Sequence, residues 1–394
     1  MSAAGLVIVG SGPGGLAAAR AFRKADPNTP VTMLTADPHP PYNRPPLTKD
    51  YLRGESSVDE LWLEDPGWYG EHDVDLRLGT VVEHLDFGEQ VVGLADGGAL
   101  AYRDLVLATG SRPKQLPVPG GEHPELIYVR DRDSGDRLLG LAEGRSGRVA
   151  VIGSGFIGCE VAASLASRGT EVLLLTEEPV PHARRLGPEA GERIGGWLRD
   201  AGVDLRVGAG VSALERRGST WRIEVDGGAT LAADAVVCGG GATPNVELGR
   251  EAGLAEESGG LVTDASLRTS APQVFAVGDI AYALNSAAGR RLRVEHWGDA
   301  ESHGEIAGAV AAGGEQVWKS APGFWSGLGE RTLKYAAWQT THHDRVLVGG
   351  DESWAVWYRS GSMLAGVLSY NDDRAYERGQ QLLERNATFA EAVG

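Results

Sequence analysis

A glycine-rich stretch near the N-terminus has the residue types and the spacing that bind the phosphates of a dinucleotide. Gly10, Gly12 and Gly15 form the pattern G-x-G-x-x-G directly after the apolar run at residues 6–9. Such glycines allow a tight turn, a close approach of backbone to a pyrophosphate, and close packing of a helix on the strand. The helix expected from residue 16 onward offers unpaired N–H groups and partial positive charge to those phosphates.

A second copy of this pattern occurs in the middle of the chain. The apolar run at residues 149–152 is followed by Gly153, Gly155 and Gly158, and then by a helix-like stretch through Leu165. One dinucleotide does not need two such units, whereas a pair of dinucleotide cofactors does. The sequence therefore predicts two βαβ units.

An acidic residue follows the second strand expected in each unit. Asp37 comes after residues 30–35, and Glu177 comes directly after residues 171–176. A carboxylate at this place accepts hydrogen bonds from ribose hydroxyls. We expect Asp37 to bind the first ribose, with an ordinary loop aspartate as the alternative. Glu177 would bind the second ribose and repel a 2′-phosphate, which predicts NADH in preference to NADPH.

Further strands end in turns that can line a ligand site. Residues 105–113 form an apolar strand that ends in Thr109-Gly110, and residues 235–245 repeat this arrangement with Gly241 in the turn. The second of these stretches should close the second unit. Another strand, residues 274–279, ends in Gly-Asp at Asp279.

A proline-rich loop lies between these elements. Residues 40–46 contain four prolines, which exclude a regular helix or a central strand. The loop that results is stiff and can hold side chains in fixed positions. On composition alone, an exposed rigid loop is the simpler interpretation.

The overall composition excludes several classes of protein. Lys and Arg number 37 and Asp and Glu number 54, so the net charge of −17 argues against nucleic-acid binding. No apolar run approaches a membrane span, and no signal-peptide pattern precedes the first strand, so we expect a cytoplasmic protein. Cys159 and Cys238 lack the spacing of a redox pair or a metal cluster, so we expect no metal site.

The pattern of elements predicts an α/β fold with more than one domain, because 394 residues exceed what one core normally holds. We expect two Rossmann-like dinucleotide-binding domains and a C-terminal α+β domain. The first dinucleotide-binding domain would be discontinuous, at residues 1–112 and 246–319, and the second would be residues 113–245. The C-terminal domain, residues 320–394, would contain antiparallel strands at 354–358 and 363–370 and a helix at 372–385.

Together these motifs resemble the flavoprotein disulphide-reductase superfamily, and more closely its ferredoxin, putidaredoxin and rubredoxin reductases. The resemblance covers essentially the whole chain. Its most specific part is Pro-Tyr-Asn-Arg-Pro-Pro-Leu-Thr-Lys at residues 41–49, and Glu295-His296-Trp297 adds to it. Apoptosis-inducing factor shares the fold.

The resemblance implies roles for individual residues. Gly10, Gly12 and Gly15 would hold the FAD pyrophosphate, and the nicotinamide dinucleotide would lie on Gly153, Gly155 and Gly158. Arg44 and Lys49 would lie against the flavin, with Glu160 paired to Lys49, since either charge buried alone would be unfavourable. The remaining residues implied to contact cofactor are Asp37, Thr109, Gly110, Glu177, Gly241, Asp279, Glu295, His296 and Trp297.

Some positions depart from the family pattern. Gly327-Leu328 replaces an Asp-Gln pair near the flavin edge, which leaves the choice of partner open. Thr176 stands where many NADH-dependent relatives carry the carboxylate. Arg184 and Arg185 could reach a phosphate if their loop folds back.

The activity implied is hydride transfer from NADH to FAD, followed by transfer of single electrons to a ferredoxin-type iron–sulphur protein that feeds a P450 or an oxygenase. The alternatives are an NADH oxidase or quinone reductase, and a redox sensor similar to apoptosis-inducing factor. The protein would be a monomer or a homodimer.

Overall fold

Three sheets form the framework of the molecule in the computed structural model, which describes residues 4–144, 147–338 and 344–394. The first sheet is parallel in the order β3-β2-β1-β6, and β19 (Val274–Ala276) pairs with the outer side of β6. Its other strands are β1 (Gly5–Val9), β2 (Val31–Leu34), β3 (Val74–Arg77) and β6 (Ala99–Leu107). The chain therefore returns to this sheet after building the second unit.

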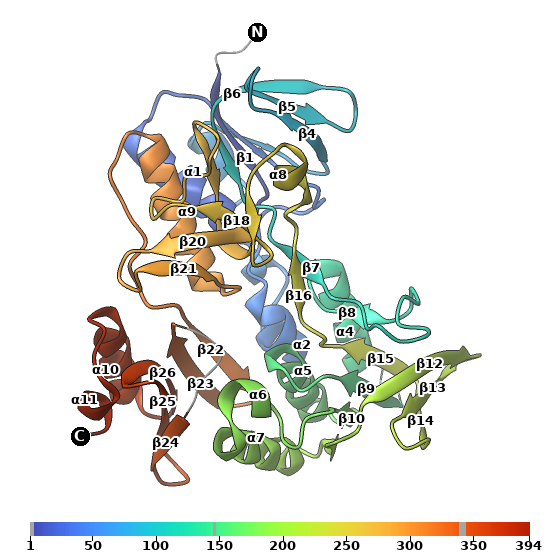
Figure 1. Cartoon of the computed structure of the whole chain (residues 1–394). Helices are drawn as coiled ribbons and strands as arrows, with labels where there is room; N and C mark the ends of the chain where they lie inside the picture. The colour runs from blue at the N-terminus through green and yellow to red at the C-terminus, as the bar shows by residue number, and fades with distance from the viewer. Residues whose placement is uncertain (1–3, 145–146, 339–343) are drawn as a thin grey trace.

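The second sheet is also parallel, in the order β11-β10-β9-β15-β8. Its strands are β8 (Ile127–Tyr128), β9 (Arg148–Ile152), β10 (Glu171–Leu175), β11 (Asp204–Arg206) and β15 (Ala235–Cys238). Strands β9, β10 and β15 are almost continuously apolar because parallel strands of this kind are covered on both faces. Figure 1 shows this unit in green below the first unit.

The helices that begin at the glycine motifs are α1 (Pro13–Ala25) in the first unit and α5 (Phe156–Ser167) in the second. The other helices of these two units are α2 (Asp50–Arg53), α3 (Trp68–Glu71), α4 (Arg132–Glu143), α6 (Ala183–Leu186), α7 (Pro188–Asp200), α8 (Glu247–Glu251) and α9 (Trp297–Ala311). The proline-rich loop contains one four-residue 3-10 helix, η1 (Pro45–Thr48), because proline is compatible with a first helical turn.

Further strands complete the two units. The antiparallel strands β5 (Val91–Leu94) and β4 (Val82–Asp86) extend the first sheet from β6. The smaller sheets contain β12 (Val211–Arg217), β13 (Thr220–Val225), β14 (Thr230–Ala233), β17 (Glu256–Glu257), β18 (Gly260–Thr263), β20 (Ala281–Asn285) and β21 (Arg290–Arg293). Two antiparallel segments, β7 (Ser111–Pro113) and β16 (Ala242–Pro244), carry the chain between the units. The domain boundaries expected near these residues stay a prediction.

The third sheet is antiparallel, in the order β22-β23-β26-β25-β24. Its strands are β22 (Gly323–Leu328), β23 (Arg331–Ala337), β24 (Asp344–Gly349), β25 (Trp354–Ser360) and β26 (Met363–Tyr370), followed by α10 (Asp373–Glu384) and α11 (Phe389–Val393). The expected strands and helix are confirmed, and the Asp372 side chain accepts a hydrogen bond from the Ala375 N–H at the start of α10.

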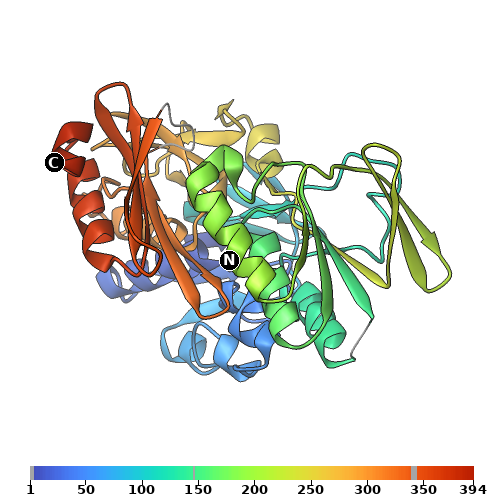
Figure 2. The same cartoon turned by 90° about the horizontal axis from the view of Figure 1, so that it is seen from below.

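Alternating side chains of the third sheet belong to two different cores. Tyr335 and Val356 pack in the core of the second unit, whereas Ala336 and Trp357 join the core of the first. This alternation follows from the two-residue period of a strand. Figure 2 shows the red C-terminal helices on one side of this sheet and the green helix α7 on the other. The sheet thus fixes the two dinucleotide-type units relative to each other.

Candidate functional site

A cavity of about 1720 Å³ lies where the three parts of the molecule meet. Its wall includes the turn after β1, the proline-rich loop, the start of α5, the segment before α9, and β22. A pocket for one small ligand typically measures about 300–1,000 Å³. The cavity therefore has room for more than one small molecule.

The first glycine motif combines a close contact with an open surface. Gly10 has a φ of +110°, and a Cβ on Gly15 would lie 2.0 Å from the Gly10 carbonyl oxygen. A Cβ on Gly12 would instead meet no chain atom within 4 Å, and Gly12 lines the cavity. Gly15 is therefore required for close packing of α1 on the turn, whereas Gly12 leaves space on the cavity wall for a bound ligand.

The second motif repeats this arrangement. Gly153 has a φ of +101°, and a Cβ on Gly158 would lie 1.9 Å from the Gly153 carbonyl oxygen. A Cβ on Gly155 would meet only the Gly239 carbonyl oxygen, at 3.9 Å, and Gly155 lines the cavity. Gly153 and Gly158 are not among the lining residues of the cavity. Gly153 allows the turn after β9, and Gly158 allows α5 to pack closely on that turn.

The polar contacts behind the first motif position the carboxylate of Asp37. Ser11 Oγ donates to Thr35 Oγ1 at 2.9 Å, and Thr35 Oγ1 accepts from the Asp37 backbone N–H at 3.2 Å. The Asp37 carbonyl oxygen accepts from the Gly79 N–H at 3.1 Å. Tyr42 Oη donates to the Asp37 carboxylate at 2.9 Å, and Asp37 lines the cavity.

The same contacts recur in the second unit, and they select Glu178. Ser154 Oγ donates to Thr176 Oγ1 at 2.8 Å, and Thr176 Oγ1 accepts from the Glu178 backbone N–H at 3.2 Å. The Glu178 carbonyl oxygen accepts from the Gly208 N–H at 3.1 Å. Glu178 is therefore the counterpart of Asp37, and it lines the cavity.

Glu177, the residue expected from the sequence to receive the ribose, does not lie on the described cavity wall. Its side chain is 62% exposed and forms an ion pair with Arg184 at 2.7 Å. A count from the threonine that ends each strand would have found Glu178, because Thr35-Ala36-Asp37 aligns with Thr176-Glu177-Glu178.

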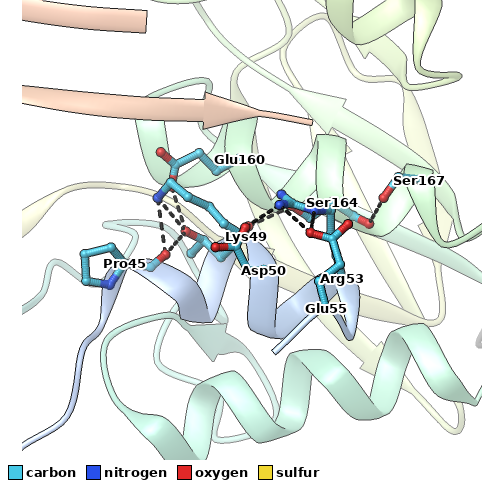
Figure 3. A network of polar contacts seen from close by, with 9 residues as sticks. Pro45, Lys49, Asp50, Arg53, Glu55, Glu160, Ser164 and Ser167 are labelled. Carbon is cyan, nitrogen blue, oxygen red and sulfur yellow. Dashed lines mark hydrogen bonds and ion pairs between the residues drawn. The ribbon is translucent and has the colours of Figure 1, made fainter. Parts of the chain in front are cut away.

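The most buried charged groups of the cavity are Lys49 and Glu160. Figure 3 shows their side chains in contact. Lys49 Nζ lies 2.6 Å from a Glu160 carboxylate oxygen, and the two side chains are 7% and 3% exposed. Lys49 Nζ also donates to the Pro45 carbonyl oxygen at 3.2 Å and lies 5.0 Å from the centre of the Trp325 ring. The pair expected from the resemblance is present.

Both oxygens of the Glu160 carboxylate have partners. Thr48 Oγ1 donates to one oxygen at 2.6 Å, and Ser326 Oγ donates to the other at 2.6 Å. These residues come from η1, α5 and β22, so all three parts of the chain meet at one carboxylate. A buried ion pair is tolerated when its remaining lone pairs are satisfied in this way. Ser326 was not among the site residues expected from the sequence.

Asp279 also lines the cavity, and its cationic partner Arg130 was not among the site residues expected from the sequence. Ser111 Oγ donates to its carboxylate at 2.6 Å, and Arg130 Nη2 lies 3.1 Å from the same oxygen. Burial lowers the pKa of Arg130, and its Nε is a buried donor without a hydrogen-bond partner. Thr109 and Gly110, from the adjacent turn, also line the cavity.

The segment before α9 contributes Glu295, His296 and Trp297 to the cavity wall. His296 Nδ1 lies 3.0 Å from a carboxylate oxygen of Asp299, in the first turn of α9. Arg185 approaches from α6, with its Nη2 3.4 Å from His296 Nε2. The structure therefore brings this segment to the second unit, as well as to the first.

Arg44 and Gly241 complete the set of expected residues on the wall. The Arg44 guanidinium lies 5.7 Å from the centre of the Tyr42 ring. Gly241 has a φ of +95° in the turn after β15, which favours glycine. The catalytic and binding roles of these residues stay predictions.

Comparison with known proteins identifies the family. Residues 4–304 match the family described as pyridine nucleotide-disulphide oxidoreductase, which covers well over half of the chain. The chain belongs to the pyridine nucleotide-disulphide oxidoreductase family. Residues 323–393 match a second family, described as reductase C-terminal, at the position of the third sheet and its helices.

Two relatives are similar to this chain over most of its length. The ferredoxin–NAD(+) reductase component of the anthranilate 1,2-dioxygenase system of Burkholderia cepacia is 36% identical over 351 residues, which are 86% of this chain and 84% of the relative. Apoptosis-inducing factor 3 of Homo sapiens is 28% identical and covers 97% of this chain, which spans 63% of that protein.

A solved structure shows the same fold. The covalent putidaredoxin reductase–putidaredoxin complex matches with a TM-score of 0.91 and 29% identity, over 98% of this chain and 94% of that one. The resemblance to ferredoxin and putidaredoxin reductases is thus confirmed, together with the α/β fold.

Membership of the pyridine nucleotide-disulphide oxidoreductases supports a flavin and NAD(H) as cofactors, and the cavity fits them. Gly12 and Gly155 each leave open space at the start of a helix, where a pyrophosphate finds backbone N–H donors. The buried, unpartnered Nε of Arg130 is a second sign that a polar group is missing from this wall. Among the described residues, no helix is long and apolar enough to cross a membrane.

Proposed function

We propose that this protein is an FAD-dependent reductase that takes electrons from NADH and passes them singly to a ferredoxin-type iron–sulphur protein. The observation that carries the proposal is the buried pair of Lys49 and Glu160, which lies on a cavity wall shared by the two dinucleotide-type units. A fixed cation at that place can stabilise negative charge that develops on a ligand during reaction.

The residues of the first unit would hold FAD. Its pyrophosphate would lie over Gly12 at the start of α1, and Asp37 would accept hydrogen bonds from its ribose. Asp279, oriented by Ser111 and Arg130, would bind the polar chain of the flavin. When bound, FAD supplies the capacity to accept a hydride and to release electrons one at a time.

Lys49 and Glu160 would then act as a unit. Glu160 orients the ammonium of Lys49 and makes its burial favourable, while Thr48 and Ser326 fix the carboxylate. Because the cation is held before any ligand arrives, no reorganisation is needed when charge develops next to it. Lys49 is therefore the proposed electrostatic catalyst, and Glu160 its positioning partner.

The second unit would bind NADH. Gly155 leaves space for the pyrophosphate at the start of α5, and Glu178 would accept hydrogen bonds from both hydroxyls of the adenosine ribose. A carboxylate in this place disfavours a 2′-phosphate by repulsion. We therefore assign the preference for NADH to Glu178, with the support of its equivalence to Asp37.

The electrons would leave without a protein disulphide. Burial raises the pKa of Cys238 to about 12, and it also raises the pKa of Cys159, so neither thiol is a thiolate at neutral pH. A relative is named as a ferredoxin–NAD(+) reductase component, and a structural neighbour is named as a complex with putidaredoxin. These names support an iron–sulphur acceptor, which would in turn feed a P450 or an oxygenase.

Steady-state reduction of cytochrome c with a panel of ferredoxins tests the proposal. We expect NADH to drive rapid reduction only when a suitable ferredoxin is added. Rapid consumption of NADH with oxygen or a quinone alone, at a rate that no ferredoxin increases, would contradict it and support an oxidase or quinone reductase.

A redox sensor is the second candidate, favoured by the match to apoptosis-inducing factor 3 over 97% of the chain. Such a sensor would form a long-lived charge-transfer complex with NADH and would change its oligomeric state. Sedimentation velocity with and without NADH, under anaerobic conditions, distinguishes it from an electron-transfer enzyme.

A further inference from the structure

Arg184, in α6, lies beside two carboxylates of the loop that joins β10 to α6. The backbone N–H of Arg184 donates to a Glu178 carboxylate oxygen at 3.1 Å, which fixes Arg184 beside the proposed ribose acceptor. The guanidinium of Arg184 pairs with Glu177, Nη2 to Oε1, at 2.7 Å. Arg184 and Glu178 line the cavity, whereas Glu177 is not on the described wall.

We propose that Arg184 is a binding group for a phosphate on the 2′ oxygen of the adenosine ribose, and that Glu177 keeps this group occupied. The proposal rests on the proposed binding of the ribose by Glu178. A guanidinium is suited to phosphate because its planar N–H donors match two oxygens at once. In this loop the carboxylate of Glu177 takes that place and would repel an incoming phosphate.

The two successive arginines of α6 have different roles. The guanidinium of Arg185 packs on two aromatic rings, 5.3 Å from the ring centres of Phe156 and Phe324, and it approaches His296. Arg184 remains 72% exposed at the rim, where a ligand can reach it. Arg184, and not Arg185, is therefore the candidate for the phosphate.

The strength of the pair sets the size of the expected effect. Glu177 and Arg184 are 62% and 72% exposed, and ion pairs at such exposure are weak. A phosphate with two negative charges can compete with one carboxylate, so discrimination against it should be graded and should depend on salt. Glu177 thus adds to the discrimination that Glu178 provides.

Isothermal titration of the FAD-loaded protein with two probes tests the proposal without any turnover. The probes are 5′-AMP, which carries the free 2′ hydroxyl, and adenosine 2′,5′-bisphosphate, which carries the phosphate. In Glu177→Gln we expect the affinity for the bisphosphate to rise about threefold to fivefold and the affinity for 5′-AMP to stay within about twofold. Adding Arg184→Ala to Glu177→Gln should abolish the gain.

A neighbouring ion pair provides the matched control. Asp204 and Arg206 form an exposed pair at 2.7 Å on β11, and neither lines the cavity. Asp204→Asn removes one negative charge near the same sheet, so it should change neither affinity by more than about twofold. A gain for the bisphosphate in Asp204→Asn equal to that in Glu177→Gln would reduce the effect to net charge and overturn the proposal.

Two outcomes separate this inference from the function on which it rests. If 5′-AMP binds and Glu178→Gln weakens it, but Glu177→Gln leaves the bisphosphate unchanged, the proposal for Arg184 is wrong and the ribose site stands. If Glu178→Gln leaves the affinity for 5′-AMP unchanged, the ribose site itself is wrong, and the proposal for Arg184 fails with it.

Discussion

The ammonium nitrogen of Lys49 lies 2.6 Å from a carboxylate oxygen of Glu160, a residue 111 positions further along the chain. Neither side chain is more than 7% exposed. Since a buried charge without a partner is unfavourable, the pair couples the position of the proline-rich loop to that of α5. A substitution in this pair should therefore change the stability of the fold as well as the rate of reaction, and the two effects can be measured separately.

Lys49→Met should damage both stability and rate. It leaves the Glu160 carboxylate buried without a cation, so the free energy of unfolding should fall by about 3–5 kcal/mol. Flavin reduction by NADH, followed by stopped-flow absorbance, should slow about 10²–10³-fold. Adding Glu160→Gln should recover stability but not rate, because the missing cation acts on the chemistry.

Arg53→Met is the control for this experiment. Arg53 also pairs with two carboxylates, Asp50 and Glu55, but its partners are 51% and 58% exposed (Figure 3). Its loss should leave the rate of flavin reduction within about twofold. A slow Arg53→Met variant, or a fast Lys49→Met variant, would refute the proposed role of Lys49.

Valine at Gly12 should prevent binding of FAD while the chain still folds. A Cβ at Gly12 meets no chain atom within 4 Å, and its φ of −70° suits any residue, so the added methyl groups can only obstruct a ligand. Absorbance at 450 nm of the purified Gly12→Val protein should be lost. Circular dichroism should show unchanged secondary structure.

Valine at Gly155 should affect the other coenzyme. This glycine has a φ of −71° at the start of α5, and a Cβ there would meet only the Gly239 carbonyl oxygen, at 3.9 Å. Gly155→Val should stay yellow, with one FAD per chain, but should no longer bind NAD(H) in a titration. Loss of FAD from Gly155→Val, or retention of FAD by Gly12→Val, would mean that the two units are assigned the wrong way round.

Glu178→Gln should raise the KM for NADH about tenfold and leave kcat within about twofold. Removing the charge weakens hydrogen bonds to the ribose that are equally strong before and during reaction, and this affects KM alone. Glu177→Gln should leave the KM for NADH within about twofold. The reverse pattern would show that Glu177, the residue expected from the sequence, is the ribose acceptor.

The stability of the protein should fall as the pH falls below neutrality. Burial lowers the pKa of His303 to about 4, from about 6.5 in the unfolded chain, against the opposing charges of Asp299 and Asp279. The unfolded chain therefore binds more protons between pH 6.5 and pH 4, so the free energy of unfolding decreases as pH falls through this range. From pH 7 to pH 5 the loss for one such group is about 2 kcal/mol.

Urea unfolding, followed by tryptophan fluorescence at pH 7 and pH 5, measures this loss. His303→Gln should have a smaller difference between the two values, because one titrating group has been removed. His182, whose pKa burial lowers to about 3, should account for much of what remains. An unchanged pH dependence in His303→Gln would show that His303 does not titrate as described.

Much of the fold follows from local sequence pattern. The apolar runs followed by Gly10 and Gly153 specify strand, turn and helix, because the required φ values of +110° and +101° favour glycine, and the spacing to Gly15 and Gly158 seats each helix on its turn. The Asp372 cap and the apolar strands of the C-terminal sheet are local in the same sense. These features depend on neighbouring residues alone.

The site itself depended on contacts that no local pattern contains. Ser326 reaches Glu160 only because β22 packs against α5, across 166 residues of sequence. Glu178, and not Glu177, lies on the cavity wall: its N–H donates to Thr176 Oγ1, and Thr176 is held in turn by Ser154 Oγ from the turn after β9. The side chains of Arg184 and Arg185 point in different directions, because Arg184 pairs with the carboxylate of Glu177 whereas Arg185 packs on aromatic rings. Sequence spacing specifies the position of a residue on its strand, turn or helix, whereas tertiary packing decides the direction in which its side chain points.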